Sequence, residues 1–131
     1  MGLFDNLIKS ADKEENSLKI NWVALNDKTQ LEDIIKISSE KPVLIFKHST
    51  RCGISRMVLK NFEREFDLEE TEITLYFLDL LNYRALSQDI SIKFNIRHQS
   101  PQVLLIKNGE VIYHDSHDYI SVGKIKELLK N

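Results

Sequence analysis

The chain has 131 residues, of which 42% are hydrophobic and 29% charged, and its formal net charge at pH 7 is −2. This size and composition predict one globular domain with one core. The small net charge argues against a nucleic-acid binder held by its overall field, and no apolar run approaches the roughly 20 residues of a membrane span, so we expect neither nucleic acid nor a membrane as a partner.

Residues 1–17 are interpreted as an N-terminal appendage, and residues 18–131 as the folded domain. Apolar side chains within residues 3–8 have the spacing of a short amphipathic helix, and a polar run at residues 12–17 separates them from the domain. Chain ends of this kind are usually surface helices or frayed termini, an interpretation that we favour over a helix that binds a partner.

The first part of the domain predicts two strands around a helix. Residues 20–25 are typical of a strand, and Thr29 followed three residues later by Glu32 is the pattern of a capping box at a helix start. Pro42 introduces the second strand, because residues 43–46 form a short apolar run of the kind found in buried strands.

The only cysteine of the chain, Cys52, lies between this second strand and a helix. A polar turn is predicted from His48 to Arg51, and a helix from about Cys52 to Phe66. The spacing of five apolar residues predicts the buried face of this helix: Ile54, Met57, Val58, Phe62 and Phe66. One cysteine cannot form an internal disulfide, which favours a reducing cytosol. We therefore expect a cytoplasmic protein. We also expect a monomer.

The rest of the chain continues the alternation of strands and helices. Residues 73–78 predict a strand, residues 83–94 a helix and residues 103–106 a further strand. Such alternation indicates parallel pairing. Asn108–Gly109 is a strong hairpin signal, so the chain is expected to return after it as an antiparallel strand. Ser121 is expected to cap a last helix.

Cys52 is predicted to be a reactive thiol, because it stands where a turn becomes a helix. Backbone N–H groups at a helix start have no intrahelical partner, and the helix dipole places partial positive charge there. Arg51 adds a full positive charge. Both influences favour the thiolate, which is the nucleophilic form of cysteine. We therefore prefer a reactive thiol to the alternative of a small buried hydrophobic residue. His48 is either an ordinary turn residue or a further influence on the thiolate.

The element order and two segments resemble thioredoxin. Residues 93–97, Pro101 and residues 104–111 are similar to the thioredoxin segment that carries its cis-proline and terminal hairpin. Residues 52–55, Cys-Gly-Ile-Ser, are similar to that family's Cys-x-x-Cys, with Ser55 in place of the second cysteine. The resemblance implies an α/β, thioredoxin-like fold with a central mixed sheet of about four to five strands flanked by helices.

A closer resemblance is to the monothiol bacilliredoxins, the YtxJ-type proteins of the bacillithiol system. It rests on two separated motifs, at residues 48–55 and 96–102, and it covers nearly the whole chain after about residue 18. That family more often has proline where this chain has Gly53. The resemblance implies bacillithiol as a thiol co-substrate, S-bacillithiolated client proteins and a low-molecular-weight thiol as partners, and no tightly bound cofactor.

Thiol–disulfide exchange needs a thiolate and a disulfide held in line with it. Cys52 would supply the thiolate. The Ser100–Pro101 loop is the candidate for holding the disulfide, because cis bonds are nearly confined to X-Pro and expose backbone groups that can pair with an incoming chain. Since Ser55 is not a thiol, Cys52 must end each turnover as a mixed disulfide with a small thiol. The resemblance implies that bacillithiol is transferred from a client protein to Cys52.

Supporting roles are expected for residues around these two motifs. Ser55 is a candidate hydrogen-bond donor to the thiolate, and Arg51 is a candidate for attracting an acidic thiol. His98 is a candidate for lining the substrate groove. Gly53 and Ile54 complete the predicted site.

No metal site is predicted. His114 and His117, together with Asp115 and Asp118, have a spacing that invites a metal interpretation. Two histidines without a cysteine nearby in sequence fall short of a four-ligand zinc site, so a solvated loop is the favoured interpretation.

Three alternative functions remain open on the sequence. Residues 52–55 resemble the Cys-Gly-Phe-Ser of monothiol glutaredoxins, which would make the protein an iron–sulfur carrier. Residues 52–56 are similar to the cysteine loop of glutaredoxin-linked arsenate reductases. The third alternative is a redox-inactive binding module that keeps the fold as a scaffold.

Overall fold

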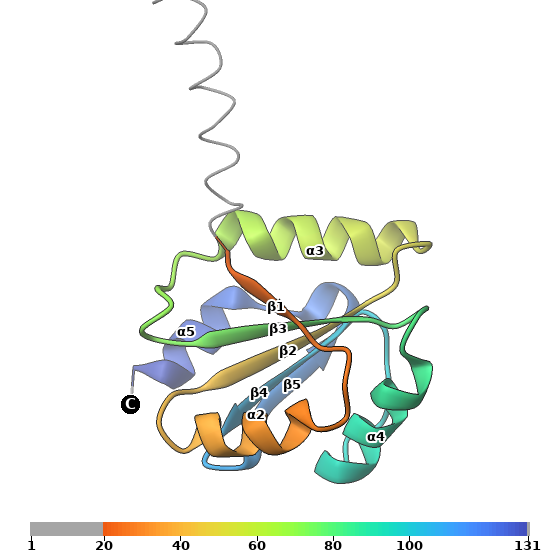
Figure 1. Ribbon diagram of the computed structural model, residues 1–131. Coiled ribbons are helices and arrows are strands. Elements are labelled where there is room, and N and C mark those ends of the chain that lie inside the picture. Colours follow the sequence, from red (N-terminus) through yellow and green to blue (C-terminus); the bar gives the residue numbers. More distant parts are fainter. Residues whose placement is uncertain (1–19, 131) are drawn as a thin grey trace, which may run out of the picture.

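A computed structural model describes residues 20–130 (Figure 1), and the predicted appendage at residues 1–17 lies outside the described residues. Five strands form one mixed sheet in the order β1-β3-β2-β4-β5. The strands are β1 (Trp22–Ala24), β2 (Val43–His48), β3 (Thr74–Asp79), β4 (Gln102–Lys107) and β5 (Glu110–Ser116). The helices are α2 (Gln30–Ser38), α3 (Gly53–Glu65), α4 (Arg84–Phe94) and α5 (Val122–Leu129), with a short 3-10 helix, η2 (His117–Tyr119), before α5. The predicted α/β architecture is confirmed.

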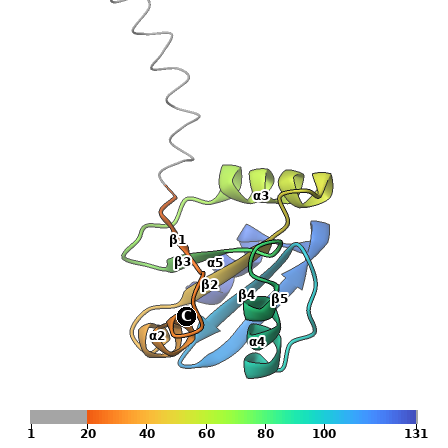
Figure 2. The same cartoon turned by 45° about the vertical axis from the view of Figure 1, so that its right-hand side comes forward.

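Helices cover both faces of the sheet (Figure 1, Figure 2), and β2 lies at its centre. Helices α2 and α4 pack on one face against Val43 and Ile45 of β2. Helices α3 and α5 pack on the other face against Leu44 and Phe46. Because the pleat of a strand sends successive side chains to opposite faces, β2 contributes to both cores, and all six of its residues are buried.

Parallel pairing is confined to β1, β3 and β2. The expectation of parallel pairing also for residues 103–106 is wrong, because β4 runs antiparallel to β2, with Gln102 opposite Lys47. The physical reason is the path of the chain between α4 and β4. Residues 95–101 bring the chain to the edge of the sheet at which β2 ends, so β4 enters from that edge and runs in the opposite direction.

The two predicted helix caps differ in outcome. Thr29 already has helical dihedral angles and makes no side-chain cap, so the capping box with Glu32 is wrong. Instead, Oε1 of Gln30 accepts the backbone N–H groups of residues 26–27, at 2.8 and 2.9 Å, which closes the turn before α2. The cap on α5 is confirmed, because the Ser121 hydroxyl accepts a backbone N–H three residues on at 3.0 Å.

The predicted hairpin at Asn108–Gly109 is confirmed. Both residues have positive φ, 54° and 78°, as the tight turns that match the twist of two paired strands require. The backbone N–H of Asn108 donates to the carbonyl of Ser38 at 2.7 Å, and that of Gly109 donates to the Ser38 hydroxyl at 2.8 Å. The hairpin tip is therefore fastened to the end of α2.

Two glycine substitutions should change stability in opposite directions. Gly109→Ala should lower the free energy of unfolding by about 1 kcal/mol, because an L side chain is strained at a φ of 78°. Gly123→Ala should raise it by about 0.5–1 kcal/mol, because Gly123 lies within α5 and its new Cβ would meet Ser121 Oγ at an ordinary 3.6 Å. Urea unfolding of both variants checks this pair, and a loss of stability in both would contradict it.

Candidate functional site

Three connections that carry the sequence-predicted residues meet at one edge of the sheet. Because β4 is antiparallel to both β2 and β5, the end of β2, the start of β4 and the end of β5 lie at the same edge. The backbone N–H of His117 donates to the carbonyl of Pro101 at 3.0 Å, which ties η2 to the Ser100–Pro101 loop. The Ser100–Pro101 peptide bond is cis. The fold thus brings this loop and the Cys52 loop, which are far apart in sequence, to one end of the molecule.

Cys52 is the residue immediately before α3 and is half-buried. Its N–H donates to the Ser49 carbonyl at 3.2 Å, and its carbonyl accepts the N–H of Arg56 at 3.0 Å, which is the first helical hydrogen bond of α3. The Arg56 guanidinium in turn donates to the Thr50 carbonyl at 3.0 Å, which closes the loop, while Arg51 is exposed. Cys52 therefore lies at the positive end of the helix dipole with two guanidinium groups on its loop and first turn.

Ser55 is fully buried one turn into α3, beneath this loop. Its Oγ accepts the backbone N–H of Ser49 at 3.1 Å and lies 2.8 Å from Nδ1 of His48. Within residues 20–130, these are the hydrogen bonds of the Ser55 hydroxyl, and the expected bond to the Cys52 sulfur is not among them. The hydroxyl is instead engaged by His48, at the end of β2, and by the Ser49 backbone.

His48 is the last residue of β2, so the expectation that it belongs to a polar turn is wrong. Only 4% of the residue is exposed, and its ring centroid lies 5.3 Å from that of Phe77. Burial lowers the pKa of the imidazole below its usual value. The carboxylate of Asp79 opposes this shift, while the cation of Arg56 reinforces it. A neutral His48 can accept a hydrogen bond from the Ser55 hydroxyl. The oxygen of that hydroxyl already accepts the backbone N–H of Ser49.

Lys47 forms a second buried polar cluster on the opposite face of the sheet, and sequence reasoning missed it. No local pattern signals its burial, because Lys47 follows the apolar run of residues 43–46 and its partners come from α4 and the loop before β4. The residue is fully buried, and its ammonium donates to the Ser87 carbonyl at 3.2 Å and to the Ser91 hydroxyl at 3.2 Å. Nδ1 of His98 lies 3.4 Å from Lys47 Nζ. Burial lowers the pKa of Lys47 from 10.5 to about 8.

Replacing Lys47 by methionine should raise the free energy of unfolding at pH 7 by about 1–3 kcal/mol, since a buried ammonium is costly to desolvate. The difference in free energy of unfolding between Lys47→Met and the wild type should shrink from pH 8 towards 10.5. In that range the folded wild type has released the Lys47 proton while the unfolded chain still binds it, so wild-type stability rises with pH. Urea unfolding at pH 7 and pH 9.5 checks this, with the exposed Lys36→Met as control. A difference that is constant with pH would contradict it.

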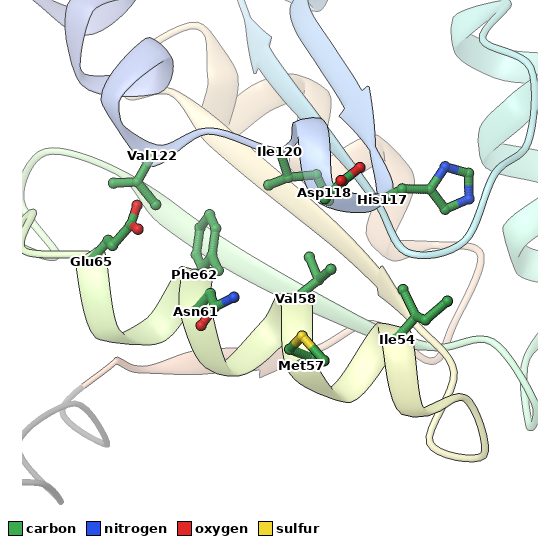
Figure 3. A pocket seen from close by; sticks show the side chains of 10 residues that line it. All are labelled: Ile54, Met57, Val58, Asn61, Phe62, Glu65, His117, Asp118, Ile120 and Val122. Carbon is green, nitrogen blue, oxygen red and sulfur yellow. The ribbon is translucent and has the colours of Figure 1, made fainter.

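A groove of about 480 Å³ runs along α3 from this edge of the sheet (Figure 3). Ile54 and Met57, expected in the buried face of α3, instead line the groove and are 60% and 63% exposed. The buried face consists of Ser55, Val58 and Phe62. The expectation fails because helical spacing alone does not show where the covering element ends. The groove is also lined by Val58, Asn61, Phe62, Glu65, His117, Asp118, Ile120 and Val122.

The remaining predicted residues lie around the same edge. Gly53 is exposed in the first turn of α3, where an added Cβ would meet only the Arg56 side chain, at 3.8 Å. His98 is exposed, two residues before Ser100 in the loop that enters β4. The Ser100 hydroxyl oxygen is buried and has no hydrogen-bond partner among the described residues.

The described part of the chain holds neither a cluster of metal ligands nor a membrane-spanning helix. No three or more His, Cys, Asp or Glu residues between positions 20 and 130 are grouped so that they could hold a metal ion. His114 and His117 are both exposed. Among the helices that the structure describes, none is long and apolar enough to cross a bilayer.

Comparison with known proteins links this geometry to thiol chemistry. Residues 23–125 match the family described as monothiol bacilliredoxin BrxC. A solved structure described as a candidate oxidoreductase with a thioredoxin fold is 29% identical and superposes with a TM-score of 0.71, covering 88% of this chain and 97% of that one. Thioredoxin from Malassezia sympodialis is 18% identical (TM-score 0.64; 84% of this chain and 89% of that one). Thioredoxin from Trypanosoma brucei brucei is 13% identical (TM-score 0.65; 86% and 94%). The fold is therefore a thioredoxin fold.

Proposed function

Because the chain belongs to the monothiol bacilliredoxin family, we propose that it removes bacillithiol from S-bacillithiolated proteins through a mixed disulfide on Cys52. Family and fold support a thiol redox role. The observation that carries the proposal is the position of the single cysteine: Cys52 is half-buried at the start of α3, at the sheet edge that also holds Pro101. Ser55 occupies the place of a second thiol, so one sulfur must carry the adduct.

The proposed reaction has two exchange steps. In the first, the Cys52 thiolate attacks the bacillithiol sulfur of the client disulfide, the bond between that sulfur and the client sulfur breaks, and the client leaves as a thiolate that takes a proton from water. In the second, the thiolate of a free small thiol attacks the bacillithiol sulfur on Cys52. This releases a small-molecule disulfide and returns the Cys52 thiolate. Each step is an attack by a thiolate, and a nucleophile that attacks in its ionised form needs no general base.

The surroundings of Cys52 supply attraction and access. Arg51 and Arg56 place positive charge on its loop and first helical turn, which favours an approaching acidic thiol. The groove along α3 begins at Ile54, next to the cysteine loop, and offers an apolar surface to the client chain. The proposed partners are therefore a bacillithiolated client and a free small thiol, and the reaction requires no bound cofactor.

Intact-protein mass spectrometry tests the proposal. The chain is mixed with a client protein that carries one S-bacillithiolated cysteine, and free thiols are blocked with N-ethylmaleimide after defined times. The client adduct should disappear while the same adduct appears on Cys52, and added bacillithiol should then clear it. A client that keeps its adduct would contradict the proposal. A matched client carrying glutathione in place of bacillithiol measures how far the site distinguishes the two thiols.

A further inference from the structure

The buried ammonium of Lys47 is fully matched by three acceptors. A lysine side chain has three N–H donors and no acceptor. The Ser87 carbonyl, the Ser91 hydroxyl and Nδ1 of His98 lie 3.2, 3.2 and 3.4 Å from Nζ. Two of these partners come from α4 and one from the loop that leads to Pro101. Lys47 therefore connects the centre of the sheet to that loop.

This arrangement fixes the proton on the His98 ring. Because the ammonium can only donate, Nδ1 of His98 must accept, and the ring must be neutral with its single proton on Nε2. The Ser87 hydroxyl, 3.2 Å from the same Nδ1, is compatible with this assignment because a hydroxyl can donate as well. Burial lowers the pKa of His98, and the charge of Lys47 lowers it further. The ring thus presents one N–H donor on its side away from Lys47.

We propose that Lys47 is a positioning residue: it holds His98 as the neutral Nε2–H tautomer, so that this N–H donates a hydrogen bond to a carboxylate oxygen of the small acidic thiol in the mixed disulfide. The proposal rests on the proposed function for the identity of the ligand. His98 is exposed, and it lies two residues before Ser100 at the sheet edge that holds Cys52. Its donor is therefore presented at the end of the molecule that carries the Cys52 loop.

Packing alone does not account for Lys47. A buried ion must be desolvated, and apolar residues of similar volume often give greater stability in its place. Its neighbours on the same face of β2, Val43 and Ile45, are apolar. What Lys47 adds is a charged hydrogen-bond donor. Of its three acceptors, His98 is the one that lies in the loop leading to Pro101.

NMR of the full-length protein with ¹⁵N-labelled histidine tests the tautomer without any substrate. At pH 7 the wild-type His98 ring should show a protonated Nε2 and an unprotonated Nδ1. In Lys47→Met the titration midpoint of His98 should rise, whereas the exposed-site control Lys36→Met should leave it unchanged. A wild-type ring protonated at Nδ1 would overturn the proposal, even if bacillithiol transfer were established.

Kinetics with a bacillithiolated client test the consequence for binding. At a pH where the His98 ring is neutral, His98→Ala should raise KM about 3- to 10-fold, the usual contribution of one hydrogen bond. Lys47→Met should raise KM by less, because the freed ring can place its proton on either nitrogen. The double variant should be no worse than His98→Ala alone, since Lys47 acts through the His98 ring. Multiplying effects would overturn the proposal. If wild type transferred no bacillithiol while the ring showed the Nε2–H tautomer, the failure would lie with the proposed function and its ligand, because the tautomer does not depend on them.

Discussion

Cys52→Ala should abolish the transfer of bacillithiol from client proteins, with a loss of at least about 10³-fold in rate, because removing the nucleophile of a covalent mechanism leaves only background chemistry. Cys52 is the only cysteine of the chain, so no second thiol can take over. The loss should appear both as persistence of the client adduct and as absence of any adduct on the variant. Release of small thiols by Cys52→Ala at the wild-type rate would contradict the mechanism.

Ser55→Ala is the matched control for this loss. The substitution removes a buried hydroxyl that bonds His48 and Ser49, but it leaves the sulfur in place. Transfer should therefore weaken and not disappear. We expect a fall of about tenfold or less, because the lost hydrogen bonds hold the loop before Cys52 and not the sulfur itself. A loss as complete as that of Cys52→Ala would mean that Ser55 has a chemical role which its contacts do not suggest.

Phe46→Ala should lower the free energy of unfolding by about 3–5 kcal/mol, the largest effect on stability that we expect from a single substitution here. Phe46 is fully buried at the centre of β2. Its ring lies against those of Trp22, Phe62 and Phe77, with centroid distances of 5.8, 5.3 and 6.5 Å. Truncation would leave a cavity between the sheet and α3 that these rings cannot fill.

Urea unfolding measures this effect, and Ile92→Ala provides the control. Ile92 is 77% exposed on α4, so its truncation should change stability by less than about 0.5 kcal/mol. A stability loss below about 1 kcal/mol would show that the aromatic cluster repacks around the missing ring.

Much of the fold can be predicted from local patterns in the sequence. The apolar run at residues 43–46, the Asn108–Gly109 turn and the Ser121 cap each depend on a few adjacent residues, and all three predictions are confirmed. The direction of β4 is not accessible in this way. It depends on where residues 95–101 deliver the chain, which is a property of the assembled sheet.

In the candidate site, too, features set by contiguous residues can be predicted and features set by the fold cannot. The position of Cys52 before α3 can be predicted from a strand, a turn and a helical pattern that are contiguous. The partners of Ser55 and the burial of Lys47 cannot, because each depends on residues that the fold brings together. The prediction of a turn at His48 fails for a related reason: a polar residue at the end of a strand looks like a loop until its covering helix is known.

The two polar residues that end β2 have a consequence for how this protein can change. Lys47 faces α4 and His48 faces α3, and neither is among the groups that shift the pKa of the other. The sheet thus separates two buried titratable side chains that are adjacent in the chain. A substitution at Lys47 therefore leaves the surroundings of His48 unchanged, so each of the two buried groups can be altered alone.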